Sequence, residues 1–201
     1  MVMSKKANTI YGILPLLEKR WSPRAFYNVD IEKEKLKRII EASRWSASAM
    51  NEQPWNFILG IKGENKTFEK ILETLVDFNK TWAKNAHVLI LACGKKNYSH
   101  NNTPNPTYLY DVGQSVAHMS VQAMHEGVYI HQMAGFSVEK ARELFGIPEE
   151  FDPVTILAMG YIGNPDTLSG ELKEREIQER TRKHFSEFVF EDKFGKKSSL
   201  F

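Results

Sequence analysis

The sequence predicts an α+β or α/β sandwich, in which a mixed sheet of four or five strands lies between layers of helices. Short apolar runs alternate with segments of helical periodicity along the 201 residues. Two of the runs, 87–93 and 154–162, show almost no polar alternation, which is typical of strands buried on both faces. A chain of this length can bury about 70% of its unfolded surface, so it needs no disulfide to hold a core.

Five helices are expected from periodic apolar residues and from start and stop signals. Asp30 and Ser137 are the predicted N-caps of two of them, and Gly146 ends the helix that Ser137 begins. Pro15 fits only near the first turn of a helix or at a kink. The expected helices cover residues 9–19, 30–45, 68–76, 108–127 and 137–145.

Four strands are expected, and a weak alternation at 185–190 predicts a fifth at one edge of the sheet. Between 94 and 107 the chain is polar, with four asparagines and two prolines. A loop of this length is often a lid or a mobile segment, so it is the candidate cover on the substrate side of a site. No repeat or linker interrupts the pattern, so residues 1–201 are expected to form one domain. The four expected strands cover residues 55–61, 87–93, 128–133 and 154–162.

The composition excludes several kinds of partner. Lys and Arg number 27 against 25 Asp and Glu, a net charge of +2 without a basic stripe, so no nucleic acid is expected. No apolar stretch approaches the ~18 residues that span a bilayer, so no membrane is expected either. The single cysteine, Cys93, suits a reducing compartment, and the N-terminus lacks the apolar core of a secretory signal. The expected location is the cytoplasm.

Several familiar chemical motifs are missing from the sequence. It contains no G-x-x-x-x-G-K-[ST] loop, no G-x-G-x-x-G between a strand and a helix, and no G-x-S-x-G elbow. His118 and His125 lie seven residues apart, but no third ligand is spaced to join them, so no metal site is expected. Cys93 follows a buried apolar run, where a thiol is usually inert.

The segment 20–26 reads Arg-Trp-Ser-Pro-Arg-Ala-Phe and is the first candidate for a site. Arg20 and Arg24 lie four residues apart with Ser22 between them. Each guanidinium is a planar fork suited to bidentate binding of phosphate or carbonyl groups, and it stays charged at any working pH. The alternative is a solvated basic turn.

The segment 46–55 reads Ser-Ala-Ser-Ala-Met-Asn-Glu-Gln-Pro-Trp and is the second candidate. Its small residues let a backbone approach a flat ligand, while Asn51 and Gln53 supply both donors and acceptors. Pro54 is expected to force Gln53 into an extended conformation that leads into the following strand. The alternative is a polar loop between a helix and a strand.

Together these two segments resemble motifs of the nitroreductase-like flavoprotein family. Its members carry Arg-(Arg/His)-Ser-x-(Arg/Lys)-x-Phe and, about two dozen residues later, Ser-x-x-Asn-x-Gln-Pro-Trp. The resemblance runs from about residue 20 to 195 and continues in register. The further matches are Asn-Lys-Thr-Trp at 79–82, Gly-Phe at 135–136, Gly-Tyr-Ile-Gly at 160–163, Arg-Thr-Arg-Lys at 180–183, Phe-Val at 188–189 and Phe-Gly at 194–195.

The resemblance implies a three-layer α/β/α sandwich and a domain-swapped homodimer with FMN in the interface. The implied activity is an FMN-dependent NAD(P)H oxidoreductase of the nitroreductase or quinone reductase type. Hydride passes from NADH or NADPH to flavin N5, then to a small electron-poor acceptor, with ping-pong kinetics. Two alternatives stay open: an FMN-binding protein without ordinary turnover, for storage or sensing, and specialised flavin chemistry such as reductive dehalogenation.

By the same resemblance, Arg20 and Ser22 hold the phosphate and ribityl end of FMN. They are joined by Arg182, together with Arg180 or Lys183. Little acid–base work is required of side chains, so no catalytic residue is assigned. The cofactor-binding residues that the resemblance implies are Arg20, Trp21, Ser22, Arg24, Ser48, Ala49, Met50, Asn51, Gln132, Met133, Ala134, Gly135, Arg180 and Arg182.

The remaining implied contacts concern the flavin ring. Arg24 matches the basic residue near the N1–O2 edge, where a fixed cation favours the reduced, anionic flavin. Residues 48–51 match a loop that lies along the ring and belongs to the other subunit. Residues 131–135 match the segment whose backbone passes N5.

Several positions depart from the family pattern. Trp21 stands where a basic residue is common, so its contact is expected to be through backbone or packing. Ala134 replaces one glycine of the usual pair, which narrows the N5 side by a methyl group. Gly113 and Ala117 lie four apart on one helix face and permit close approach of another helix, either in a dimer or within one subunit.

Overall fold

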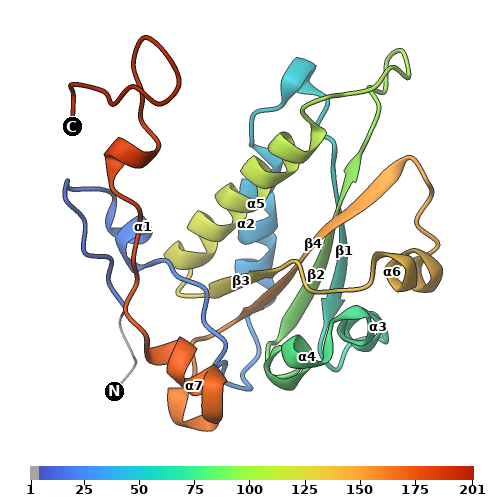
Figure 1. Ribbon diagram of the computed structural model, residues 1–201. Helices are drawn as coiled ribbons and strands as arrows, with labels where there is room; N and C mark the ends of the chain where they lie inside the picture. Colours follow the sequence, from blue (N-terminus) through green and yellow to red (C-terminus); the bar gives the residue numbers. More distant parts are fainter. Residues whose placement is uncertain (1–4) are drawn as a thin grey trace.

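The computed structural model describes residues 5–201 and contains one four-stranded sheet (Figure 1). The strands are β1 (Trp55–Ile61), β2 (Val88–Lys95), β3 (Tyr129–Met133) and β4 (Phe151–Gly160), in the order β1-β2-β4-β3. All three pairings are antiparallel, so the expectation of a mixed sheet is wrong. Apolar runs reveal that both faces of a strand are covered, but they carry no information on strand direction.

The two central strands divide the core into two layers. Along β2, Val88, Ile90 and Ala92 belong to one apolar cluster, while Leu89 and Leu91 belong to the other. All these side chains are buried, because each face of the sheet is covered by helices. This alternation with a period of two explains why the run lacks polar residues.

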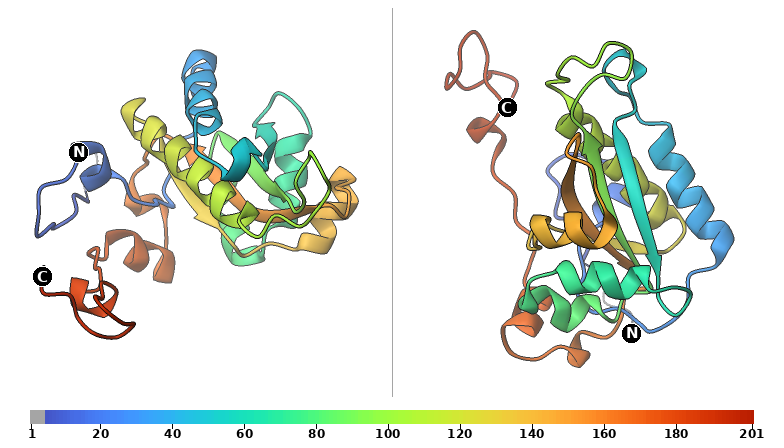
Figure 2. Two further views of the ribbon diagram at one scale, coloured as in Figure 1. Left: turned by 90° about the horizontal axis from the view of Figure 1, so that it is seen from above. Right: turned by 90° about the vertical axis from the view of Figure 1, so that its right-hand side faces the viewer.

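Helices cover both faces, as the sandwich prediction requires (Figures 1 and 2). On one face lie α2 (Lys33–Arg44) and α5 (Tyr108–His125), and on the other α3 (Thr67–Thr74), α4 (Asp77–Ala83) and α6 (Val138–Phe145). In α6, the Ser137 hydroxyl accepts the N–H of Lys140, and Gly146 ends the helix at φ 59°, as predicted.

The helices predicted at 9–19 and 68–76 are among those that are shorter in the structure. Residues 9–14 are not helical, and α1 (Pro15–Lys19) begins at the proline, whose missing N–H costs nothing at a first position. The helix predicted at 68–76 ends at Thr74, since Leu75 pairs with Phe136 in an isolated bridge and Val76 donates to the Gly135 carbonyl. A separate helix, α4, then begins at Asp77.

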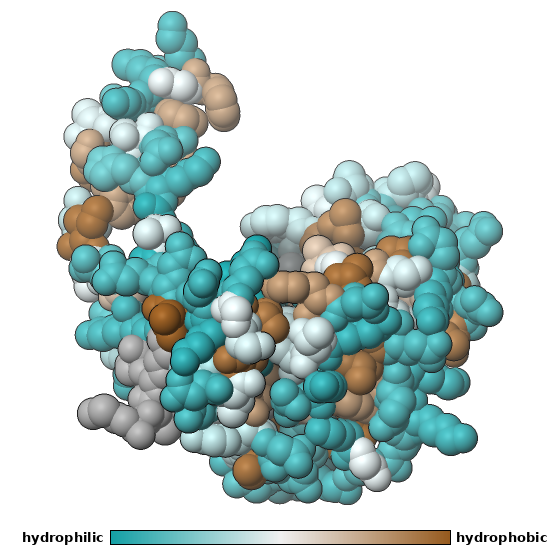
Figure 3. Space-filling model, turned by 60° about the horizontal axis from the view of Figure 1, so that its bottom comes forward, coloured by the Kyte–Doolittle hydropathy of each residue, from teal (hydrophilic) through white to brown (hydrophobic). Residues whose placement is uncertain are grey.

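The last part of the chain contains α7 (Gly170–Ile177) and a tail that rises clear of the body (Figures 2 and 3). The fifth strand predicted at 185–190 is wrong: the tail has a short 3-10 turn, Phe185–Glu187, and only an isolated bridge further on. Its aromatic rings pack on one another and on the N-terminal segment rather than on the sheet. Phe185 stacks on Phe201 with ring centroids 4.3 Å apart, and Tyr11 lies 5.6 Å from Phe185.

Within residues 5–201, no helix combines the length and apolar character that crossing a membrane requires.

Candidate functional site

Three arginines from opposite ends of the chain lie close together. Arg20 follows α1, and Arg180 and Arg182 follow α7. Burial lowers the pKa of Arg20, and the charge of Arg182 lowers it further. Burial also lowers the pKa of Arg180, with Arg20 and Arg182 adding to the effect. We call these three residues the arginine cluster.

No carboxylate of the described residues forms an ion pair with the arginine cluster. The ion pairs between arginines and carboxylates in the described residues involve four other arginines: Arg38, Arg44, Arg142 and Arg175. Arg180 instead donates to two backbone carbonyls, those of Lys5 at 2.9 Å and Glu18 at 2.7 Å. Gathering like charges is unfavourable unless an anion balances them. The cluster therefore has the charge and the donors to bind an anion such as a phosphate.

The backbone after Arg20 is anchored by Trp21. Its indole is 6% exposed, lies edge-on to Tyr129 of β3 at 6.4 Å and carries the Lys5 ammonium 4.5 Å above its ring. Its ring N–H is buried without a hydrogen-bond partner among the described residues. Trp21 thus acts through packing, and Ser22 beside it stays partly exposed.

Arg24 is the second charged group of the segment and is half-buried. Burial lowers its pKa, and the nearby Glu176 carboxylate opposes that change. The carboxylate accepts hydrogen bonds from the backbone N–H groups of Arg24 and Ala25 rather than from the guanidinium. The Nε of Arg24 is buried and has no partner among the described residues. A buried donor left unpaired in this way fits a ligand that brings an acceptor.

Strand β3 lies next to the segment 20–26 and contacts it through His131. The ring of His131 contacts Trp82 with centroids 4.5 Å apart, and its Nδ1 lies 2.9 Å from the Pro23 carbonyl. Because a carbonyl can only accept, Nδ1 carries the proton in that bond. Gln132 and Ala134 are exposed beyond this point, and Met133 is buried.

Gly135 marks the close approach of this strand end to α4. A Cβ there would lie 2.9 Å from the Asn79 amide nitrogen and 3.0 Å from Val76. That amide donates to the Gly135 carbonyl at 3.2 Å. A side chain at this position would therefore have to displace the Asn79 amide from its bond to the Gly135 carbonyl. Residues 20–24, 131–135 and 180–182 thus belong to one region of the molecule.

Residues 48–51 lie elsewhere. They form a turn, Ala49–Asn51, whose Ala49 N–H donates to Asp111 in the first turn of α5. Figures 1 and 2 show α1 beside the opposite end of α5, which is about 27 Å long at 1.5 Å per residue. Within one chain, the structure does not bring Ser48, Ala49, Met50 and Asn51 to the arginine cluster.

The backbone of this turn is strained and its surface is open. Met50, Asn51 and Gln53 have φ values of 53°, 54° and 52°, in the left-handed region that such residues rarely adopt. The extended geometry expected for Gln53 is therefore wrong; its N–H donates to the Ser48 hydroxyl and closes the turn. The Met50 side chain is 72% exposed. A strained loop with an exposed apolar tip is suited to contact another molecule.

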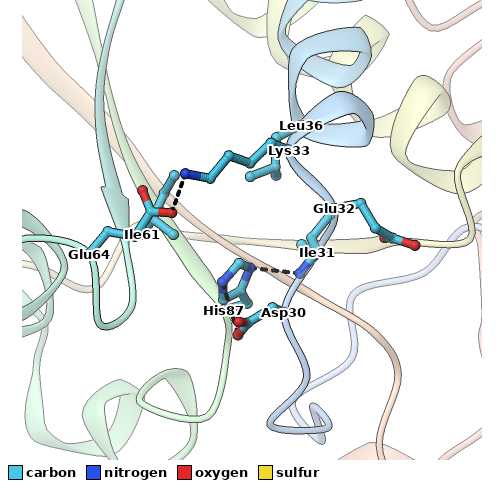
Figure 4. A pocket seen from close by; sticks show the side chains of 8 residues that line it. All are labelled: Asp30, Ile31, Glu32, Lys33, Leu36, Ile61, Glu64 and His87. Atoms are coloured by element: carbon cyan, nitrogen blue, oxygen red, sulfur yellow. Dashed lines mark hydrogen bonds and ion pairs between the residues drawn. The ribbon is translucent and has the colours of Figure 1, made fainter.

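A cavity of about 200 Å³ lies between the start of α2 and β2 (Figure 4). His87 Nδ1 accepts the Ile31 N–H at 2.9 Å, and its Nε2 lies 3.2 Å from the Asp30 carboxylate. Asp30 thus contacts His87 and is not the predicted N-cap of α2, a position held by Glu32. These bonds attach the chain before α2 to the end of the sheet, and the cavity is separate from the region around Arg24.

The described residues contain no group of three or more His, Cys, Asp and Glu side chains placed to hold a metal ion. His118 and His125 are both exposed on α5. Sequence reasoning missed Glu176, which lies in a charged tail segment among chemically identical neighbours. It considered His131 only as part of a matched stretch, because no local pattern reveals a bond to a residue 108 positions away.

The fold and this region together define an α+β protein that carries a basic segment beside an edge strand of its sheet. A family model described as the nitroreductase family matches residues 17–161. The chain belongs to the nitroreductase family.

Individual relatives agree with this assignment. A crystal structure described as an oxidoreductase containing FMN has a TM-score of 0.89 and 32% identity, covering 98% of this chain and all of that one. A nitroreductase family protein from Clostridium difficile 630 has a TM-score of 0.69 and 25% identity, over 89% and 96% of the two chains. A Methanothermobacter thermautotrophicus protein, provisionally named NADH dehydrogenase/NAD(P)H nitroreductase, is 29% identical over 77% of this chain and 80% of its own.

Proposed function

We propose that this protein is an FMN-dependent NAD(P)H oxidoreductase of the nitroreductase or quinone reductase type. The observation that carries the proposal is the arginine cluster, three guanidinium groups without a carboxylate partner among the described residues. An FMN phosphate is a dianion that matches their charge and donors. The relative described as containing FMN and the one provisionally named for NAD(P)H support the same choice.

In this proposal Arg20, Arg180 and Arg182 bind the phosphate, and Ser22 contacts the ribityl chain. The backbone carbonyls that hold Arg180 fix its side chain before any ligand arrives, which lowers the entropy lost on binding. Trp21 contributes the packing that holds this stretch against β3.

Arg24 faces the pyrimidine edge of the flavin ring in the proposal. Its unpartnered Nε supplies a donor for a ring oxygen or nitrogen, and its charge stabilises negative charge there. Backbone groups of Gln132, Met133, Ala134 and Gly135 pass the N5 side. The chemistry that FMN supplies when bound is electron transfer from NADH or NADPH to an electron-poor acceptor.

A second copy of the chain completes the site in this proposal, because one chain holds residues 48–51 far from its own arginine cluster. α5 offers a face for a partner: Gly113 and Ala117 are exposed, Tyr110 is 70% exposed, and a Cβ on Gly113 would meet nothing within 4 Å. Gly113 is therefore not needed for packing inside this chain.

The tail supports a domain-swapped arrangement. Phe194 and Leu200 are 95% and 75% exposed, because they lie in the tail, which projects away from the body of the domain (Figure 3). Apolar side chains exposed on an extended arm gain burial only against another molecule. A partner subunit covering the tail would supply that burial.

The first test is the visible spectrum of the purified protein, before and after anaerobic addition of NADPH or NADH. The proposal expects a yellow protein that bleaches with a reduced nicotinamide and turns over with an added quinone. A yellow protein that neither donor bleaches would favour storage, sensing or specialised flavin chemistry. A colourless protein that takes up no added FMN would overturn the proposal.

The phosphate contacts are tested by Arg20→Ala combined with Arg182→Ala. Flavin content should collapse while the protein stays folded, because both cations leave the cluster. The matched control, Lys19→Ala with Lys193→Ala, removes two exposed charges and should retain flavin. Full occupancy in the arginine variant would mean that the phosphate binds elsewhere.

The segment 94–107, whose first two residues form the end of β2, remains the proposed cover of the substrate side. It is fastened to the 48–51 turn by Glu52, whose carboxylate accepts the backbone N–H of Ser99 at 2.9 Å and also the hydroxyl of Ser99. Shortening the loop should change the range of acceptors and leave FMN content intact. Loss of flavin in the shortened protein would contradict this role.

A further inference from the structure

Glu176 is a buried carboxylate that the proposed function leaves without a role. Its side chain is fully buried in α7, where Oε1 accepts the N–H groups of Arg24 and Ala25 at 3.0 Å and Oε2 accepts the Arg24 N–H at 2.9 Å. Its backbone carbonyl accepts the Lys5 ammonium at 2.7 Å. Removing a carboxylate from water costs free energy, so its hydrogen bonds to the backbone of 24–25 must offset that desolvation.

A second side chain holds the same segment from the other side. His131 of β3 donates its Nδ1 proton to the Pro23 carbonyl, and its ring is held by Trp82 of α4. One residue thus binds the amides that follow Pro23 and the other binds its carbonyl. They reach this stretch from 152 and 108 positions along the chain.

The segment needs these bonds because it belongs to no strand. Its own backbone pairing consists of an isolated bridge between Phe26 and Ile162, and of the Gly163 N–H donating to Ala25. Without Glu176 and His131, the Pro23 carbonyl and the N–H groups of Arg24 and Ala25 would lack fixed partners, and Arg24 would lie on a mobile loop.

We propose that Glu176 and His131 are positioning residues, a clamp that fixes the backbone of 23–25 so that the Arg24 guanidinium is held ready at the flavin ring. This inference rests on the proposed function. The clamp acts on the ring end of the ligand, whereas the arginine cluster is anchored separately through Arg180 and acts on the phosphate. A cation fixed in advance binds more tightly than one that must be ordered.

The two ends of the ligand separate in a binding experiment with flavin-free protein. FMN carries the phosphate and riboflavin lacks it, so the ratio of their dissociation constants reports the phosphate contacts, and riboflavin alone reports the ring end. Glu176→Gln should weaken both ligands by about tenfold and leave the ratio unchanged. The matched control is Glu174→Gln, an exposed glutamate on the same helix, which should leave both constants unchanged.

His131 is tested by two substitutions that differ in one bond. An asparagine amide can occupy the place of Nδ1, so His131→Asn should retain the bond to Pro23 and bind riboflavin like the native protein. His131→Leu removes the bond and should weaken riboflavin and FMN by the same factor. Glu176→Gln and His131→Leu remove bonds on opposite sides of the segment 23–25. Either variant, if it folds, is therefore enough to test the clamp.

A double-mutant cycle shows whether the clamp acts through Arg24. In an Arg24→Ala background, Glu176→Gln should cause no further loss of riboflavin affinity. The midpoint potential of the bound flavin in the Glu176→Gln variant is an independent test. Displacement of the Arg24 cation lowers this potential, whereas loss of the Glu176 negative charge by itself raises it.

Native riboflavin affinity in folded Glu176→Gln or His131→Leu protein would overturn the clamp, as would a raised potential or additive losses in the cycle. Failure of the proposed function would look different, because the native protein itself would then bind neither FMN nor riboflavin.

Discussion

The protonation of His131 makes the stability of the flavin-free protein depend on pH. Burial, and then the nearby charge of Arg24, lower the pKa of His131 from 6.5 to about 4. Above pH 6.5 the ring is neutral in both the folded and the unfolded chain, and its contribution to stability is fully present. Between the two pKa values only the unfolded chain binds the proton, so stability falls as pH falls toward 4.

The magnitude follows from the two pKa values. A difference of about 2.5 between them corresponds to about 3 kcal/mol of unfolding free energy when the pH is well below 4, and to about 2 kcal/mol at pH 5. His131→Asn removes the titrating group and keeps a donor for the Pro23 carbonyl. The variant should therefore lose about 2 kcal/mol less than the native protein between pH 7.5 and pH 5.

Urea unfolding of both flavin-free proteins at the two pH values measures this difference. Other groups titrate in the same range, among them His87, whose pKa is also lowered by burial, but they are present in both proteins and cancel. Equal losses of stability in the native protein and the variant would refute the assignment of a low pKa to His131.

Two further predictions concern packing. Gly163→Ala should lower the unfolding free energy by about 2–3 kcal/mol, because the new Cβ would lie 2.7 Å from the Phe26 backbone. Gly113→Ala, whose Cβ would meet nothing within 4 Å, should leave the unfolding free energy of the isolated chain unchanged or raise it by up to ~1 kcal/mol. Thermal unfolding of both variants measures the contrast. Cys93 is 3% exposed, and burial raises its pKa to about 11, so a thiol reagent should label it only in denaturant; rapid labelling of the native protein would contradict this.

The sequence predicts the apolar core better than the ends of its elements. Strand β1 matches its predicted bounds of 55–61, whereas β2 continues two residues past the apolar run predicted at 87–93 and β4 begins three residues before the run predicted at 154–162. The end of α3 could not be predicted, since Leu75 leaves the helix to pair with a residue 61 positions later. Strand direction was also beyond reach: a run that is apolar throughout is typical of parallel sheets, but this antiparallel sheet has such runs because helices cover both of its faces.

Some residues of the candidate site could be predicted from the sequence and others could not. Arg20 and Arg24 are predicted because their spacing forms a recognisable motif, and the tail arginines follow from the same resemblance. Glu176 carries no such signal, since Glu171 and Glu174 on the same helix are exposed and only the tertiary placement of α7 buries the third. A residue that acts through backbone amides far along the chain leaves no pattern in its own neighbourhood.

The separation between Arg24 and Glu176 also sets an order of events during synthesis. A ribosome adding about 5–20 residues per second needs roughly 8–30 s to make the 152 positions between them. Until then the early arginine segment lacks both its carboxylate and the two tail arginines, although all four strands have already been made. A nascent or prematurely ended chain would thus contain all four strands but neither Glu176 nor the two tail arginines, and under the proposed function it would bind FMN only weakly.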